Sequence, residues 1–281
     1  MPKNAQDVFD RSRWFADRML LDDLVFRLEH YRSGTWDGGD HFRFYKIKEL
    51  VDQYAVHFRR HPGYQPKRIL ELGIFDGGSV AFWHELFRPE KHVAVDLIDR
   101  KDSPYFQRYL ASRDLSGRIA TFWNTNQADQ RRLRSIIASE FDGPIDLVID
   151  DASHLYSPTL ATFEAVFPLM SPGGIYIIED WAWGHWPEFA GPDHAWARET
   201  PPTRLVVQLI EAAGTSSELI ASIDVCRGFV AVERGPQVVA DPESFTLEGG
   251  VFRRPDYSAR RSLPTRMRAL LARTFGFARS R

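Results

Sequence analysis

The feature that most constrains the fold is a short apolar run that ends in a glycine-rich turn and continues as a helix. The run Arg68-Ile69-Leu70-Glu71-Leu72 has strand character, the turn holds Gly73, Gly77 and Gly78, and residues 79–87 have helical character. Small residues are needed where a chain reverses tightly from a strand into a helix and where its backbone approaches a ligand. The segment therefore predicts the first strand–helix unit of an α/β domain, with a ligand crevice at this turn.

Further apolar runs alternate with helical segments along most of the chain. Strands are expected at residues 92–96, 118–123, 145–149, 174–178, 220–225 and 228–233, and helices at residues 130–141, 156–170 and 203–213. Strands with nearly continuous apolar character are buried on both faces, which is typical of a parallel sheet covered by helices. We therefore predict an α/β, Rossmann-like fold with a mostly parallel seven-stranded sheet and helices on both faces.

The chain divides into three predicted parts. Residues 1–62 are expected to form an N-terminal helical extension, because apolar residues recur at helical spacing over residues 5–30 and 42–58. Residues 63–236 form the predicted core, and residues 237–281 a C-terminal segment. From Phe252 onward this segment carries nine arginines and one acid, with an amphipathic stretch over residues 267–277. Such a tail can bind a membrane surface or nucleic acid, but packing on the domain or on a partner subunit is the preferred interpretation.

Composition excludes several classes of protein. A net charge of -2 over 281 residues gives no reason to expect a nucleic-acid partner. The single cysteine, Cys226, cannot form an intramolecular disulfide or a cysteine-rich metal site. No apolar run approaches the length of a membrane span, and the N-terminus lacks the apolar core of a signal peptide. We therefore expect a cytoplasmic protein.

Two carboxylates at the glycine-rich turn indicate the kind of ligand. Glu71 and Asp76 would repel a pyrophosphate, whereas S-adenosylmethionine carries a cationic sulfonium and an α-amino group. Asp96, at the end of the second strand, is placed to accept hydrogen bonds from ribose hydroxyls. The competing interpretation is a short-chain dehydrogenase, which needs a Tyr-x-x-x-Lys pair downstream, and the chain has no lysine after Lys101. The sequence therefore favours a methyltransferase.

Acids and a histidine follow the fourth and fifth predicted strands. Asp151 and His154 lie after the fourth strand, and Glu179 and Asp180 after the fifth. The carboxyl ends of neighbouring parallel strands face the same crevice, so these carboxylates should converge, and with no lysine nearby they should repel one another. A hard divalent cation such as Mg²⁺ would neutralise them, and His154 would suit a base beside it. Alternatively, Asp151 or Ser153 caps the next helix and His154 is structural.

These motifs resemble the metal-dependent sugar O-methyltransferases of macrolide and related antibiotic pathways, such as the mycinamicin-type 2''-O-methyltransferases and the rhamnosyl O-methyltransferases. The resemblance covers residues 69–235 and rests on Leu70-Glu71-Leu72-Gly73 with Asp76-Gly77-Gly78-Ser79, on Asp151-Ala152-Ser153-His154, and on Pro172-Gly173-Gly174 leading to Glu179-Asp180. Residues 124–129 resemble the family's Gly-Asp-Gln turn near the adenine, but Asn126 replaces an acid and Thr125 a glycine. Cephalosporin hydroxylase-type methyltransferases form a related group.

The resemblance implies a class I methyltransferase fold and a set of roles. It implies that Asp151, Glu179 and Asp180 bind Mg²⁺ and that His154 is the general base. The predicted cofactor-binding residues are Glu71, Gly73, Asp76, Gly77, Ser79, Asp96, Gln127 and Asp150. The implied reaction is methylation of a hydroxyl of a sugar or a glycosylated natural product.

The segment after the fifth strand bears on the acceptor. Residues 181–202 hold four tryptophans and four prolines, which predicts either a sugar-stacking specificity loop or a loop held by aromatic packing. The N-terminal extension is expected to supply another wall of the site or a contact between subunits of a homo-oligomer. Two other functions remain open, namely a methyltransferase that uses His154 without a metal and a cofactor-binding protein without catalytic activity.

Overall fold

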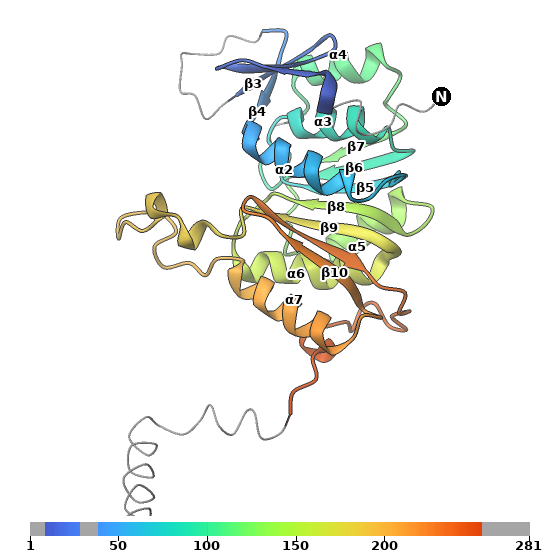
Figure 1. Cartoon of the computed structure of the whole chain (residues 1–281). Helices are drawn as coiled ribbons and strands as arrows, with labels where there is room; N and C mark the ends of the chain where they lie inside the picture. The colour runs from blue at the N-terminus through green and yellow to red at the C-terminus, as the bar shows by residue number, and fades with distance from the viewer. Residues whose placement is uncertain (1–8, 29–38, 100, 255–281) are drawn as a thin grey trace, which may run out of the picture.

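The computed structural model describes residues 9–28, 39–99 and 101–254 and has a seven-stranded central sheet (Figure 1). Its strands are β5 (Arg68–Leu72), β6 (Lys91–Val95), β7 (Ile119–Phe122), β8 (Ile145–Asp150), β9 (Met170–Glu179), β10 (Ile220–Val225) and β11 (Phe229–Arg234). Their order across the sheet is β10-β11-β9-β8-β5-β6-β7. The strands from β9 to β7 pair in parallel, and β11 is antiparallel to both of its neighbours. The predicted mostly parallel sheet is confirmed.

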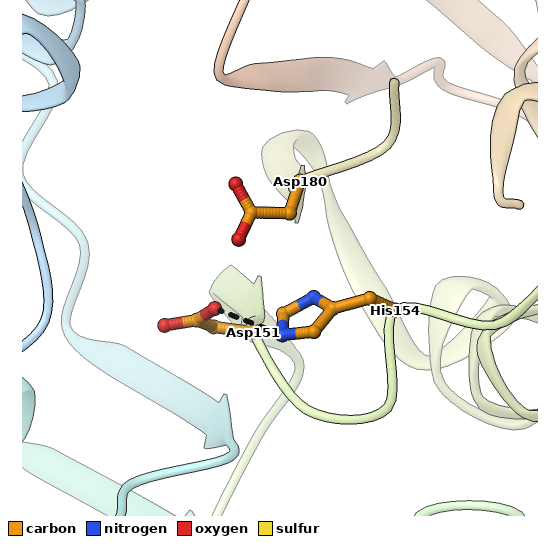
Figure 2. Close-up of side chains that lie close together, drawn as sticks. All are labelled: Asp151, His154 and Asp180. Carbon is orange, nitrogen blue, oxygen red and sulfur yellow. Dashed lines mark ion pairs between the residues drawn. The ribbon is translucent and has the colours of Figure 1, made fainter. Parts of the chain in front are cut away.

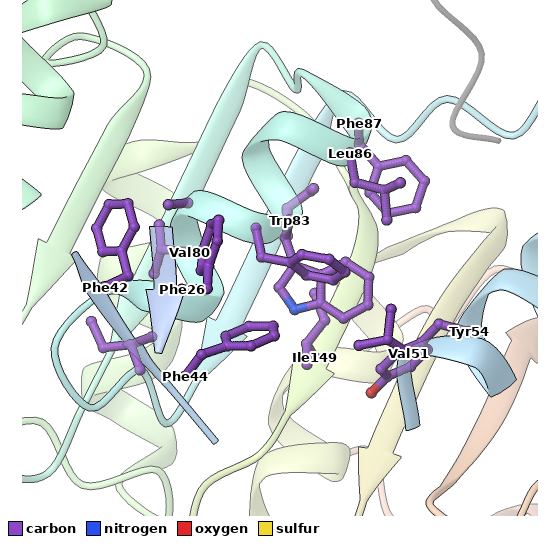
Figure 3. Packing of buried hydrophobic residues seen from close by; sticks show 14 of the residues in the cluster. Phe26, Phe42, Phe44, Val51, Tyr54, Val80, Trp83, Leu86, Phe87 and Ile149 are labelled. Carbon is purple, nitrogen blue, oxygen red and sulfur yellow. The ribbon is translucent and has the colours of Figure 1, made fainter. Parts of the chain in front are cut away.

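Helices cover both faces of this sheet, as predicted. They are α2 (Lys48–Arg59), α3 (Gly78–Phe87), α4 (Pro104–Ser112), α5 (Gln130–Glu140), α6 (Tyr156–Val166) and α7 (Thr203–Thr215), with short 3-10 turns at Phe167–Leu169, Trp183–His185, Pro187–Phe189 and Glu248–Gly250. Successive residues of β8 contribute to opposite cores. Ile149 packs in the cluster that α2, α3 and α4 cover (Figure 3), and Val148 packs in the cluster that α5, α6 and α7 cover. This alternation explains why the strands are apolar throughout.

The N-terminal part differs from its prediction. Residues 12–28, expected to be helical, form β1 (Ser12–Trp14), β2 (Arg18–Leu21) and β3 (Leu24–Leu28), and β4 (Phe42–Phe44) pairs in parallel with β3 to complete a four-stranded sheet. Every second residue of β3 is buried. That period of two is the burial pattern of a strand. The spacing of the apolar residues, which suggested a helix, only approximates a helical period. The second helix, expected over residues 42–58, is confirmed from Lys48 onward, where α2 begins.

Aromatic packing attaches the small sheet to the core. The ring of Phe44 on β4 lies 5.3 Å from that of Phe82 on α3, and Tyr54 on α2 lies 4.8 Å from Trp83. Figure 3 shows Phe44, Tyr54 and Trp83 in one cluster, to which Phe82 also belongs. The backbone approach is just as close, because a Cβ on Gly78 would lie 2.1 Å from the carbonyl oxygen of Arg43. The segment at β4 is thereby fixed directly over the start of α3.

The C-terminal segment is described only up to residue 254. Leu247 is buried in the cluster beside α6 and α7, and Phe245 and Val251 pack against that cluster. The arginine-rich amphipathic stretch at residues 267–277 lies outside the described residues. Within the described part, no helix has both the length and the apolar character needed to cross a bilayer.

Candidate active site

A cavity of about 850 Å³ opens where the parallel strands end at their carboxyl termini. Residues that follow β5, β6, β7, β8 and β9 line one side of it, and residues 43–47 with part of α2 line the other. In open α/β sheets this edge is the usual position of a ligand site. The expected wall from the N-terminal extension is therefore present, although a sheet and one helix build it.

The glycine-rich turn after β5 requires glycine for two separate reasons. Gly73 has φ of +82°, which residues with a side chain rarely adopt, and a Cβ there would lie 2.1 Å from the carbonyl oxygen of Asp151. Gly77, with φ of +93°, precedes the first residue of α3. The carboxylate of Asp96 accepts hydrogen bonds from the backbone amides of Ile74 (2.9 Å) and Phe75 (2.8 Å). Asp96 therefore holds the turn in shape as well as facing the cavity.

The predicted cofactor residues fall into two groups of four. Gly73, Ser79, Asp96 and Gln127 line the cavity, whereas Glu71, Asp76, Gly77 and Asp150 do not. The side chain of Glu71 is fully buried, and its carboxylate lies 3.1 Å from Nε2 of His92 on the adjacent strand. Because the sheet is buried on both faces, the side chain of Glu71 lies in the core and contacts His92 there, away from the cavity.

Asp150 belongs to a buried network behind the cavity. Its carboxylate accepts hydrogen bonds from Nε2 of Gln127 (3.0 Å) and from the hydroxyl of Tyr176 (2.9 Å). Burial raises the pKa of Asp150 to about 6, against the effect of these two donors. The Gln127 side chain also accepts a hydrogen bond from the amide of Ser153 (2.8 Å). The network therefore fixes the loop that carries Asp151 and His154.

Asp151, His154 and Asp180 converge on one point at the cavity wall (Figure 2). Each offers one potential ligand atom, and these three atoms all lie within 4.8 Å of one another. Nε2 of His154 is 3.8 Å from Oδ1 of Asp151. Burial, followed by the nearby charge of Asp151, raises the pKa of Asp180. The expected convergence of the ends of β8 and β9 is thus present.

Local backbone geometry favours a functional over a capping role for this loop. His154 has φ of +54° and Asp180 has φ of +50°, conformations that cost energy and concentrate at functional sites. Among the described residues, α6 has no side-chain cap, because its N-cap position is Leu155. The capping alternative for Asp151 and Ser153 is therefore not realised.

A lysine that sequence reasoning missed lies among the acids. Nζ of Lys46 is 2.9 Å from Oδ2 of Asp151 and 2.5 Å from Oε1 of Glu179. Burial alone would lower the pKa of Lys46, but these two carboxylates raise it, so the ammonium stays charged. Burial and Asp151 raise the pKa of Glu179, whereas the ammonium of Lys46 lowers it. The expectation that no lysine lies near the acids is wrong. Lys46 precedes Asp151 by 105 positions in the sequence, and the fold brings the two side chains into contact.

The aromatic segment after β9 positions His154. Nε1 of Trp183 donates a hydrogen bond to the carbonyl oxygen of His154 (2.7 Å), and the ring of Trp196 lies 5.8 Å from the imidazole. Phe189 stacks on Trp196 with ring centroids 5.6 Å apart. Trp186 lines the cavity. The packed aromatics therefore support the histidine, and one tryptophan of the segment faces the cavity.

Comparison with known proteins identifies the core. A family model described as a methyltransferase domain matches residues 70–181, which include the glycine-rich turn and the cluster of Asp151, His154 and Asp180. Residues 70–181 therefore resemble a methyltransferase domain. The chain superimposes on MycE, a methyltransferase of the mycinamycin biosynthetic pathway solved in complex with Mg, SAH and mycinamycin VI, with a TM-score of 0.51 and 29% identity over 68% of this chain and 51% of that one. The predicted class I methyltransferase fold is confirmed.

Curated relatives are sugar O-methyltransferases, as the motifs implied. The chain is similar to the mycinamicin VI 2''-O-methyltransferase of Micromonospora griseorubida, with 33% identity over 50% of this chain and 34% of the relative. It is also similar to the 8-demethyl-8-alpha-L-rhamnosyl tetracenomycin-C 2'-O-methyltransferase of Streptomyces olivaceus, with 30% identity over 55% of this chain and 38% of the relative. The chain spans less than half the length of the curated relatives that it matches.

Proposed function

We propose that the protein is an S-adenosylmethionine-dependent and Mg²⁺-dependent O-methyltransferase that acts on a hydroxyl of a sugar or glycosylated natural product. The observation that carries this proposal is the group of Asp151, His154 and Asp180 beside the glycine-rich turn of a methyltransferase domain. The similarity to sugar O-methyltransferases supports the class of acceptor. A cytoplasmic location and a small-molecule acceptor, without a nucleic-acid partner, belong to the same proposal.

The residues present fit both groups that this reaction needs. Backbone within 2.1 Å of a Cβ on Gly73 leaves no room for a side chain, which suits a turn that a cofactor approaches closely. Asp151 and Asp180 supply the carboxylate oxygens that Mg²⁺ prefers, and they would hold the ion from two neighbouring strand ends. The ion would supply a Lewis acid that makes a nearby hydroxyl more acidic. The sequence also predicts Glu179 as a ligand, but in the structure its carboxylate contacts Nζ of Lys46.

His154 provides the proton acceptor. Its Nδ1 is buried and has no hydrogen-bond partner among the described residues, and its Nε2 faces the carboxylate of Asp151. A neutral imidazole can take the proton of the acceptor hydroxyl at Nε2. S-adenosylmethionine would supply the methyl group to the deprotonated oxygen, and the break of its carbon–sulfur bond would leave a neutral thioether. Correct placement of the hydroxyl supplies much of the rate.

The acceptor would enter between the N-terminal wall and the aromatic segment. Trp186 and Glu188 line this part of the cavity together with Arg227, whose guanidinium lies 5.7 Å from the centre of the Trp186 ring. An aromatic face bordered by charged groups suits a sugar ring, which presents both C–H and hydroxyl groups. The cavity volume of about 850 Å³ is large enough for part of an acceptor in addition to the cofactor.

A mass-shift screen tests the proposal directly. The protein is incubated with S-adenosylmethionine and a panel of glycosylated polyketides and their aglycones, with Mg²⁺ or with a chelator. We expect a gain of one methyl group on glycosylated members only, and only with Mg²⁺. Equal turnover in chelator would select the metal-independent alternative. Cofactor binding without turnover of any hydroxyl acceptor would contradict the proposed reaction.

Trp183→Phe is expected to lower kcat about tenfold and to leave the KM for S-adenosylmethionine unchanged. Phenylalanine keeps an aromatic ring but lacks the Nε1–H group that donates to the carbonyl of His154. A lost buried hydrogen bond costs about 1–3 kcal/mol. The matched control is Trp181→Phe, because Nε1 of Trp181 donates to the carbonyl of Cys226 (2.8 Å), away from His154. A similar fall in both variants would show that the effect is general to the aromatic segment.

A further inference from the structure

The reaction proposed above gives no role to Lys46, the buried lysine of the site. Lys46 follows β4 in the N-terminal part of the chain and meets acids at the ends of β8 and β9. The side chains of Lys46 and Glu179 are each only 2% exposed. Two charges so far from water are stable together only as a pair, and removing either partner leaves the other uncompensated.

The two oxygens of Asp151 have different neighbours. Oδ2 contacts Nζ of Lys46, whereas Oδ1 faces Nε2 of His154. Asp180 is grouped with Asp151 and the imidazole, and Glu179 is not part of that group. Lys46 is thus a cation of the chain itself that contacts two of the three carboxylates, those of Asp151 and Glu179. The acids are divided into a pair held by Lys46 and a group that is open to the cavity.

We propose that Lys46 is a resident cation that withdraws Glu179 and one oxygen of Asp151 from the metal site. This chain then binds a divalent cation through Asp151 and Asp180, beside His154, and its affinity for that cation is lower than three free carboxylates would give. The inference rests on the metal site of the proposed function but not on the acceptor or on methyl transfer. Lys46 is a positioning residue, since it acts on the cation through Asp151 and Glu179.

The electrostatic consequence of removing Lys46 is an increase in metal affinity. Lys46→Met deletes a positive charge beside the site and releases the carboxylate of Glu179 to face an incoming cation. A positive charge close to the site repels a divalent cation, so we expect its removal to raise the affinity at least about tenfold. The same change should lower the thermal stability of the metal-free protein, and added metal should restore it.

The test uses Mn²⁺ as the probe, titrated into the full chain without acceptor and followed by electron paramagnetic resonance and thermal melting. Lys46→Met should bind Mn²⁺ at least about tenfold more tightly than the natural protein. The matched control is Lys48→Met, two residues away, which removes an exposed pair with Asp52 and should leave Mn²⁺ affinity unchanged. Unchanged or weaker binding by folded Lys46→Met would overturn the proposal.

A double variant keeps the test decisive if Lys46→Met does not fold. Lys46→Met with Glu179→Gln removes both charges of the buried pair, so it should fold and bind Mn²⁺ within about threefold of the natural protein. If Glu179 is itself a ligand of the ion, the double variant loses Mn²⁺ affinity by more than about tenfold, which overturns the proposal. Failure of every form to bind Mn²⁺ would overturn the metal site as well, whereas binding without methyl transfer would affect only the proposed reaction.

Discussion

Replacing Asp151 with Asn is expected to reduce methyl transfer at least about a hundredfold, while S-adenosylmethionine binding stays within about threefold of its original value. Asp151 is the one acid that contacts Lys46 and also belongs to the group with His154 and Asp180. The amide keeps the shape of the side chain but removes its charge. The turn around Gly73 should be undisturbed, because the atoms nearest to the Cβ position of Gly73 belong to the backbone of Asp151 and Ala152, which the substitution leaves in place.

The measurement pairs single-turnover methyl transfer with a binding titration of S-adenosylmethionine. Asp52→Asn is the matched control, because Asp52 forms the exposed ion pair with Lys48 and lies outside the cavity. We expect this control to keep full activity, since exposed pairs contribute little. If Asp151→Asn retained more than half of the activity, the assignment of Asp151 as a metal ligand would fail. If it lost cofactor binding as well, Asp151 would instead support the turn.

The central sheet could be predicted from sequence because its signal is local. Each buried strand carries an apolar run, as Leu147 to Ile149 does on β8, and the ends of such runs define the crevice. Parallel pairing then brings Asp151 and Asp180 together whatever the side-chain details. The small N-terminal sheet could not be predicted in this way. Its short strands are stabilised by packing on α3, as with Phe44 on Phe82, and that contact is invisible to a local pattern.

The same distinction separates the site residues that were predicted well from those that were not. A position at a strand end indicates which residues approach the crevice but not which way a side chain points. Glu71 points into the core toward His92, and Asp150 points toward Tyr176. Lys46 shows the opposite case, since nothing near it in sequence suggests a site and only the tertiary fold brings it there. Pairing of distant charges is the part of this site that a single sequence does not reveal.

Gly73→Ala is expected to lower the melting temperature by about 5–10 °C and to weaken S-adenosylmethionine binding at least about tenfold. Alanine at φ of +82° costs about 1–2 kcal/mol on its own account. Its Cβ would also lie 2.1 Å from the carbonyl oxygen of Asp151, which no real contact allows, so β5 and β8 must separate at the site. The turn that faces the cavity would move with them.

Gly63→Ala is the control that separates these two costs. Gly63 has almost the same backbone angle, with φ of +84°, but a Cβ there would meet nothing within 4 Å. It should therefore lower stability by about 1–2 kcal/mol and leave cofactor affinity unchanged. Thermal melting and a cofactor titration on both variants measure the difference, which reports the close approach of the turn to Asp151. Equal effects of the two substitutions would mean that Gly73 is needed only for its backbone angle, and the turn would then not depend on its contact with the loop that carries the acids.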